Sequence, residues 1–143
     1  MQRLQTMVLV TAVACTLAAA HATASVDLSP KPGGVFLLKP GVFVTTGQTC
    51  EDPANAGIRW YDGKGIHGTA THACIATIVA KKGKRFTVDQ SCVDTPAGEG
   101  PQRVERQTIT IEDALTFVIG RGAKATRYRY CPTYELPAGL KGQ

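Results

Sequence analysis

The fold depends most on residues 73–93, which read ACIATIVAKKGKRFTVDQSCV. Two runs rich in β-branched residues flank a basic turn, and Gly83 is the turn signal, so the segment predicts a β-hairpin. A three-residue loop over 82–84 would pair Ile78 with Val88 and Ala80 with Phe86. One face would then carry these four apolar side chains toward the core. The same register places Cys74 directly opposite Cys92.

The cysteines support this register. Cys15 lies in the apolar N-terminal segment, and the remaining four are Cys50, Cys74, Cys92 and Cys131. An even number in an exported domain of this size predicts two disulfides. The hairpin favours Cys74–Cys92, and Cys50–Cys131 follows by elimination. Since the chain has no Cys-x-x-Cys pair, we expect no zinc site, and no other metal or cofactor.

Residues 107–119 predict a second hairpin. Gln107–Ile111 alternates polar and apolar residues, and Leu115–Ile119 returns after a turn at 112–114. The expected register pairs Ile111 with Leu115 and Ile109 with Phe117. Further strand-like runs lie at Val35–Leu38, Val42–Thr46, Ile58–Tyr61 and Thr126–Tyr130. This pattern predicts an all-β fold: a small antiparallel meander that closes into a lipocalin-like barrel, or a two-sheet sandwich.

The N-terminus resembles a targeting segment. Residues 1–24 combine Arg3, an apolar run and the small residues Ala22 and Ala24, and they predict a secretory signal peptide cleaved after Ala24. A short membrane anchor and a lipoprotein signal with Cys15 as the lipidated residue are the alternatives. Residues 25–34 are expected to form an extended arm, and residues 35–143 a single β domain. The predicted location is therefore the periplasm or the extracellular space.

The charge of the chain is mildly basic. The formal net charge is +5, and it falls to +4 when the predicted leader, with Arg3, is removed. Lys82, Lys84 and Arg85 form the densest basic cluster, at the predicted hairpin turn. It permits weak contact with an anionic surface. The charge is too small, and too evenly spread, to predict nucleic-acid binding.

The sequence contains no recognisable catalytic constellation, and we therefore expect no enzyme. His67 and His72 are the only histidines after residue 24, and their odd spacing on one strand would point them to opposite faces. Ser91 lies beside Cys92 without the glycine turn that exposes a nucleophile.

Trp60 and Tyr61 are the aromatic residues with the strongest case for a binding role. A lone tryptophan in a small β domain is usually part of the core, but at an exposed rim it would anchor a partner. The alternation Arg127-Tyr128-Arg129-Tyr130 predicts one tyrosine face and one arginine face. The loops Gln48–Gly57 and Asp94–Arg103 are the expected contact surface.

In general plan, a leader followed by a small disulfide-bonded β domain, the chain resembles periplasmic protease and lysozyme inhibitors of bacteria. The likeness covers architecture alone, because the Ser-Gly-x-x-x-Tyr signature of lysozyme inhibitors is missing. We interpret the chain as an exported, non-enzymatic binding protein, an inhibitor or adaptor of an envelope enzyme whose partner is a protein. A structural envelope protein is one alternative. The other is a binder of small apolar ligands whose barrel interior is lined by Ile78, Phe86, Val88, Ile109 and Phe117.

Overall fold

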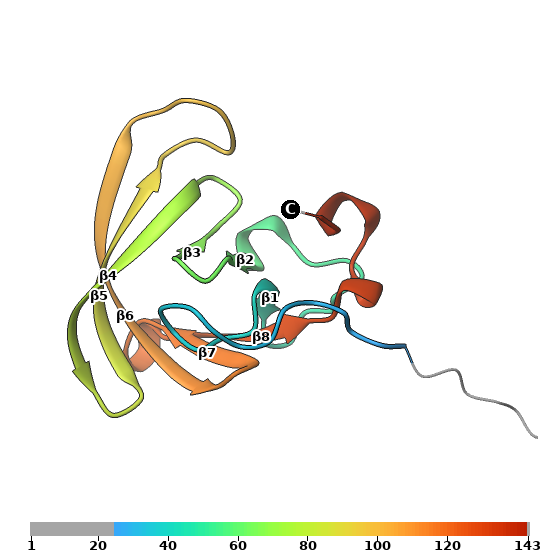
Figure 1. Ribbon diagram of the computed structural model, residues 1–143, viewed down its shortest axis with the longest axis horizontal. Helices are drawn as coiled ribbons and strands as arrows, with labels where there is room; N and C mark the ends of the chain where they lie inside the picture. Colours follow the sequence, from blue (N-terminus) through green and yellow to red (C-terminus); the bar gives the residue numbers. More distant parts are fainter. Residues whose placement is uncertain (1–24, 143) are drawn as a thin grey trace, which may run out of the picture.

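A computed structural model describes residues 25–142 as one eight-stranded antiparallel sheet that curls into a nearly closed barrel (Figure 1). The predicted leader, residues 1–24, lies outside the described residues. The strands are β1 (Gly41–Thr45), β2 (Ile58–Tyr61), β3 (Ile66–His67), β4 (His72–Lys82), β5 (Arg85–Val93), β6 (Gln102–Asp113), β7 (Thr116–Ile119) and β8 (Thr126–Cys131). The all-β prediction is confirmed, and of the two predicted architectures the structure has the barrel.

The strand order makes the barrel a meander. Each strand pairs with the next along the chain except at one place, and β8 pairs with β1. The remaining seam lies between β3 and β4. Two hydrogen bonds bridge it: Ala76 N–H donates to the Lys64 carbonyl at 2.9 Å, and Ile66 N–H donates to Gln90 Oε1 at 2.8 Å. A Cβ on Gly65 would lie 2.4 Å from the Cys74 carbonyl oxygen, so only glycine permits this close approach.

The hairpin of β4 and β5 confirms part of the predicted register and corrects the rest. Ile78 pairs with Val88 as expected, but Ala80 pairs with Thr87 and not with Phe86. The turn is shorter than predicted, because Lys82 already pairs with Arg85, and a bulge between Ile78 and Ala80 absorbs the extra residue. Ile78 and Ala80 are exposed on β4, which is an edge strand, so the prediction that they belong to the core face is wrong.

The hairpin of β6 and β7 is also shifted from its predicted register. Ile109 pairs with Ile119 and Ile111 pairs with Phe117, two residues away from the expected partners. A shift of two residues keeps the same side chains on the inner face, so Ile109, Ile111 and Phe117 are buried as expected. Leu115 instead lies in the turn and is 46% exposed.

The predicted strand Val35–Leu38 is wrong, because this segment folds as a plug. We use this name for residues 33–38, a turn closed by the bridge between Gly33 and Leu38. Leu37 has a φ of 54°, which breaks an extended strand. The Phe36 ring is 1% exposed and packs edge-on against Phe86 at 5.6 Å, on the far side of the seam. Residues 33–38 thus fill a gap that strand pairing leaves open.

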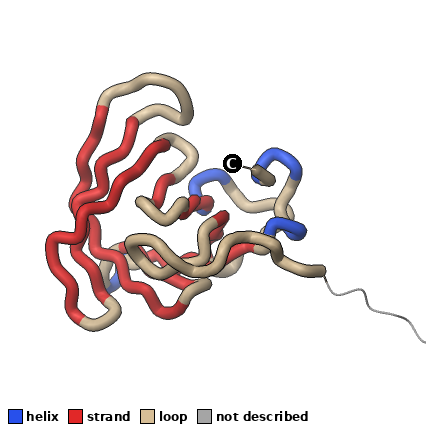
Figure 2. The backbone as a smooth tube through the Cα atoms, in the orientation of Figure 1, coloured by secondary structure: helices blue, strands red, loops and turns tan. Residues whose placement is uncertain are grey.

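The core has two parts. Inside the barrel, aromatic rings pack against aliphatic side chains: Phe117 stacks on Tyr128 and meets Phe43 edge-on, with ring centroids 5.0 Å apart in both pairs. Outside the barrel, the C-terminal tail (residues 132–142) covers β1 and β2, with Leu136 6% exposed against Val44 and Trp60. In the Arg-Tyr alternation of β8, the tyrosines face the core. Figure 2 shows that short helical turns and loops make up most of this tail.

Both predicted disulfides are confirmed. Cys50–Cys131 joins the β1–β2 loop to the end of β8, and Cys74–Cys92 joins β4 to β5, with Cα atoms 5.6 Å and 4.1 Å apart. Two intramolecular disulfides indicate an oxidising environment, extracellular or periplasmic. Among residues 25–142, no helix is long and apolar enough to cross a membrane.

Candidate binding cleft at the barrel mouth

An open cleft of about 500 Å³ lies at one end of the barrel, which we call the mouth. Here β5 ends and β6 begins, below the long loop that connects them at the top of Figure 1. The cleft is bordered by Ala56, Arg59, Ile66, Gly68, Thr69, Ala70, Thr71, Gln90, Cys92, Arg103, Glu105, Gln107 and Ile119. Most of these residues are polar or small, in contrast with the aromatic interior below them.

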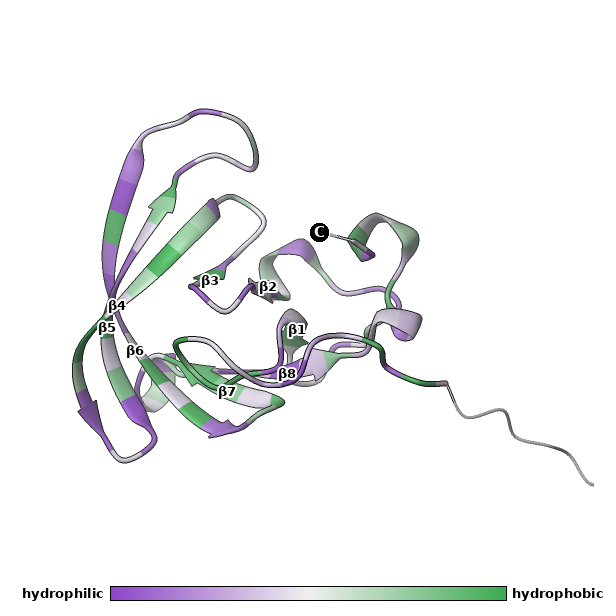
Figure 3. Cartoon of the chain, in the orientation of Figure 1, coloured by the Kyte–Doolittle hydropathy of each residue, from purple (hydrophilic) through white to green (hydrophobic). Residues whose placement is uncertain are grey.

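The polar wall of the cleft comes from the inward side of β6. The apolar core positions Ile109 and Ile111 continue, in steps of two, as Gln107, Glu105 and Arg103. Because side chains alternate across a strand, these polar residues share the inner face with the core. Figure 3 shows the same change along β6, which is mainly hydrophilic beside the long loop and alternates farther down. The inner surface therefore changes from apolar to polar within one strand.

Gln90 marks the boundary between the two surfaces. Gln90 is 4% exposed, and it is the one polar residue that is buried among residues 25–142. Its Oε1 accepts the Ile66 N–H across the seam, and its Nε2 donates to Gln107 Oε1 at 3.2 Å. A buried amide with both ends bonded costs little to bury, so Gln90 closes the core and orients the floor of the cleft.

Arg59 is the cation at the base of the cleft. It pairs with Phe43 on the inner face of the sheet, and its guanidinium lies over the Tyr128 ring at 5.1 Å from the centroid. Its Nη1 donates to the carbonyls of Ile58 at 2.6 Å and Ala56 at 3.1 Å. Within residues 25–142, no carboxylate forms an ion pair with it.

The other charges of the cleft lie on the opposite wall. Arg103 forms an ion pair with Asp94 at 2.9 Å, and its side chain is 70% exposed. Glu105 is exposed and forms no ion pair with any described residue. On the outer face of the same strands, Arg106 holds Asp89 through two hydrogen bonds of 2.7 Å and lowers the pKa of that carboxyl. Arg106 and Asp89 are thus paired on the outer face, while Arg59 and Glu105 form no ion pair with a described residue in the cleft.

Each of the two predicted contact segments contributes one residue to this cleft, although the residue of the second segment belongs to β6 and not to the loop. Gln48–Gly57 contributes Ala56, and Asp94–Arg103 contributes Arg103. The structure corrects the end of the second loop, because β6 already begins at Gln102. Residues separated by more than 40 positions in sequence therefore border one opening.

Trp60 and Tyr61, predicted as binding residues, are 7% and 2% exposed. Tyr61 Oη donates to the Gly33 carbonyl at 2.7 Å and accepts the Phe36 N–H at 3.1 Å, so it holds the plug. Both residues border a groove of about 860 Å³ outside the barrel, between the N-terminal arm and the tail. A role of these two residues in binding stays a prediction.

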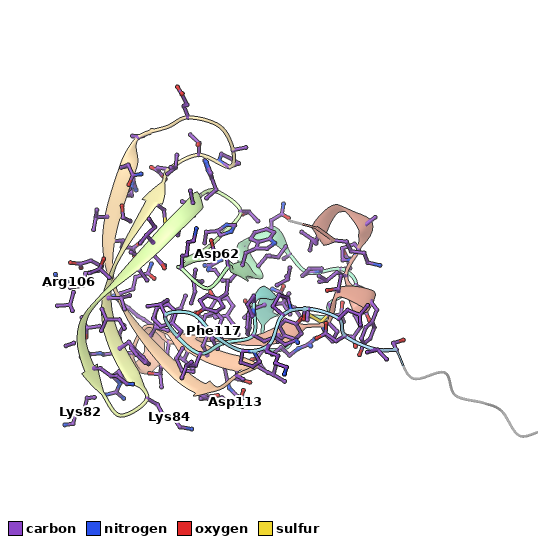
Figure 4. All side chains as sticks on the ribbon, in the orientation of Figure 1. Asp62, Lys82, Lys84, Arg106, Asp113 and Phe117 are labelled. Carbon is purple, nitrogen blue, oxygen red and sulfur yellow. A yellow bond between two sulfur atoms is a disulfide. The ribbon has the colours of Figure 1, made fainter. Side chains whose placement is uncertain are left out.

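The predicted basic cluster lies at the opposite end from the mouth. Lys82, Lys84 and Arg85 are exposed at the turn between β4 and β5, and Figure 4 shows Lys82 and Lys84 at the tip of this hairpin. Lys84 Nζ donates to the Glu112 carbonyl at 2.6 Å, which ties the turn to β6. The structure therefore does not bring this cluster together with Trp60 and Tyr61 in one site.

The two histidines make local contacts. The His67 ring stacks on Trp60 with centroids 5.2 Å apart, and His67 Nδ1 lies 3.1 Å from the Thr71 carbonyl. His72 Nδ1 lies 2.7 Å from the Thr95 carbonyl. No group of three or more potential metal ligands occurs among the described residues.

The sequence contained a signal for the polar wall. Arg103, Glu105 and Gln107 have the same parity as the core residues Ile109 and Ile111, so their inward direction follows from the length of β6. The assignment of 94–103 to a loop hid this signal.

In the comparisons with known proteins, no family model, curated protein or solved structure matched the chain.

Proposed function

We propose that this chain is an exported, non-enzymatic binding protein that receives a segment of a protein partner at the mouth of its barrel. It would act in the periplasm or outside the cell, as an inhibitor or adaptor of an envelope enzyme. The proposal rests on one observation: an open, polar cleft lies above a barrel whose interior is already filled by side chains.

The packing of the interior supports binding at the mouth over binding inside. Of the five residues expected to line an apolar ligand cavity, Ile78 is exposed, and the other four, Phe86, Val88, Ile109 and Phe117, are at most 7% exposed and pack in one cluster with Phe36. An apolar ligand would have to displace this cluster. A ligand at the mouth would meet amides, hydroxyls and charges without disturbing the core.

The rigidity of the mouth also supports the proposal. Cys74–Cys92 crosslinks β5, which contributes Gln90 and Cys92 to the cleft, to β4, and the bonded Gln90 amide connects β5 to β3. A preorganised site loses less conformational entropy when it binds. Loops on a rigid barrel are a common arrangement for protein recognition.

The experiment compares two matched arginine substitutions. Thr69 borders the cleft, and its side chain makes no hydrogen bond to another residue in 25–142, so Thr69→Arg would place a long side chain in the opening without breaking a described contact. Thr77→Arg adds the same side chain at an exposed site on β4, outside the cleft. The full-length chain with a C-terminal tag is exported so that both disulfides form, and it is then used to capture envelope proteins.

We expect the wild type and Thr77→Arg to retain the same stoichiometric partner, and Thr69→Arg to lose it. Circular dichroism and thermal unfolding check that both variants fold. Equal capture by Thr69→Arg would reject the mouth as the binding site, and an empty capture by well-folded wild type would reject the protein-binding function.

A further inference from the structure

Arg59 is a cation whose surroundings in the described chain do not neutralise it. We infer that Arg59 anchors the partner by accepting the carboxylate of an aspartate or glutamate side chain into the barrel mouth. This inference rests on the proposed function and specifies the chemistry of the partner. An acidic segment of a protein is therefore the expected occupant of the cleft.

The guanidinium is held in a fixed orientation. The carbonyls of Ile58 and Ala56 accept hydrogen bonds from Nη1, and the Tyr128 ring supports the guanidinium plane from one side. Gly68 leaves room for it, since a Cβ there would lie 3.3 Å from Nη1. Nε and Nη2 make no hydrogen bond to any described residue, and these two atoms form the edge that binds a carboxylate in bidentate geometry.

Because no described carboxylate forms an ion pair with Arg59, a carboxylate bound there would come from the partner. Four ion pairs occur among residues 25–142, and they use Lys39, Arg103, Arg106 and Arg127. Arg59 is partly buried in a cleft where the effective dielectric constant is lower than in water. A cation in this position gains more from a bound carboxylate than an exposed lysine would.

The remaining lining favours a single negative charge. Glu105 lies on the facing wall of the cleft, Gln90 and Gln107 contribute amides, and the second cation of the lining, Arg103, is already paired with Asp94. A phosphate carries more charge and usually requires several cations or backbone N–H groups. One arginine beside neutral amides suits a carboxylate, and the opening of about 500 Å³ accommodates a side chain carried on a protruding segment.

The test uses substitutions that separate charge from geometry. Arg59→Gln removes the charge, and Arg59→Lys keeps it but removes the bidentate edge and the planar stacking on Tyr128. We expect the affinity for the captured partner, measured by calorimetry, to fall at least about tenfold in Arg59→Gln, with a smaller loss in Arg59→Lys. Glu105→Gln removes from the cleft a negative charge that would repel the partner's carboxylate. This variant should therefore bind the partner as tightly as wild type or more tightly.

The outcomes distinguish the role of Arg59 from the location of the binding site at the mouth. If Thr69→Arg abolishes capture while Arg59→Gln binds within about twofold of wild type, the mouth remains the site and Arg59 is not the anchor. If Thr69→Arg still binds, the proposed function falls. Thermal unfolding of Arg59→Gln must stay close to wild type, because a loss of folding would also reduce binding.

A partner-independent titration tests the same chemistry. Acetyl-Gly-Asp-Gly-amide and its asparagine counterpart are added to ¹⁵N-labelled protein, and the Nε–H signal of Arg59 is followed by NMR. We expect a saturable shift with the aspartyl peptide and none with the asparaginyl peptide. Equal responses to the two peptides, or none to either, would overturn the inference. Saturation by acetate at the same concentration as the aspartyl peptide would assign the site to free small carboxylates instead.

Discussion

The two halves of β5 and β6 have the same backbone pattern and opposite chemistry. Near the basic turn, the inward side chains are Phe86, Val88 and Ile109, which are buried in the aromatic core. Near the mouth, the same inward direction carries Glu105 and Gln107 into an open cleft. One strand pair therefore stabilises the fold at one end and presents a polar surface at the other.

This difference indicates where the barrel retains contact with water. An inward polar side chain is costly where the interior is dry, and it persists where its bonds are satisfied or where solvent enters. The buried Gln90 has both ends of its amide hydrogen-bonded, whereas Glu105 remains exposed to solvent. A partner segment would replace water at the mouth without changing the packing below it.

The largest expected effects concern the disulfides, which belong to different regions. Cys50–Cys131 spans 81 residues outside the barrel, and Cys74–Cys92 spans 18 residues in the wall of the cleft. By chain entropy, replacing the first pair by alanine should cost about 4.5 kcal/mol of unfolding free energy, and replacing the second about 3 kcal/mol. Denaturant unfolding measures both losses. The reverse order would show that the wall contributes more stability than the outer crosslink.

The next comparison uses two inward positions, one in each half. Phe117 is 0% exposed and packs against Phe43 and Tyr128, so Phe117→Ala should cost about 4 kcal/mol. Glu105→Ala, at the mouth, should change the stability by less than about 0.5 kcal/mol. Urea unfolding of the two variants decides whether the halves differ, and similar losses would contradict the division. Figure 4 shows Phe117 inside the barrel.

A third prediction concerns the boundary between the halves. Gln90→Ala would leave the buried Ile66 N–H without its acceptor and should cost about 2 kcal/mol. The matched control Gln107→Ala removes a bond of 3.2 Å at the edge of the cleft and should cost less than about 1 kcal/mol. Hydrogen exchange at the Ile66 amide should accelerate only in Gln90→Ala. Unchanged exchange would mean that Gln90 does not close the seam.

The smallest expected effect concerns Tyr61, which holds the plug. Tyr61→Phe removes the hydrogen bonds of the hydroxyl with Gly33, Phe36 and Gly63 and should cost about 1 kcal/mol near neutral pH. Burial raises the pKa of Tyr61 above its ordinary value of 10.0, although the hydrogen bond from Phe36 opposes this shift. Between the ordinary pKa of the unfolded chain and the raised pKa of the folded chain, Tyr61 loses its phenolic proton only in the unfolded chain. Stability should therefore fall as pH rises above 10.

Stability measured against pH tests this sign. Burial raises the pKa of Tyr130 as well, so Tyr61→Phe should reduce the alkaline loss and leave part of it in place. An alkaline loss that is identical in wild type and Tyr61→Phe would show that Tyr61 does not contribute to it.

Local patterns were sufficient to predict most of the strands and both crosslinks. The alternation in residues 107–111 and the turn signal at Gly83 identified both long hairpins, and the pairing of Ile78 with Val88 was correct. Turn length was less certain, because a bulge near Val79 and a shift of two residues at Ile111 both leave Phe86, Val88, Ile109 and Phe117 buried, although Ile78 and Ala80 are exposed. Such alternatives differ little in apolar burial, so the pattern alone does not select between them.

The plug and the cleft required long-range information. The run Val35–Leu38 is apolar enough for a strand, and only the positions of Tyr61 and Phe86 in space show why it turns and inserts Phe36. The unpaired charge of Arg59 likewise depends on which carboxylates the fold brings near it. These features depend on contacts between segments that are far apart in the sequence, and the pattern of a single segment does not predict them.

The most direct test of the proposed division is a map of the bound surface. Amide signals of the ¹⁵N-labelled chain are recorded with and without the captured partner, and the shifted residues are placed on the barrel. We expect the changes to gather at Thr69, Thr71, Glu105 and Gln107 around the mouth, with the Phe117 region unaffected. Changes confined to Lys82–Arg85 would instead place binding at the basic turn and remove the mouth from consideration.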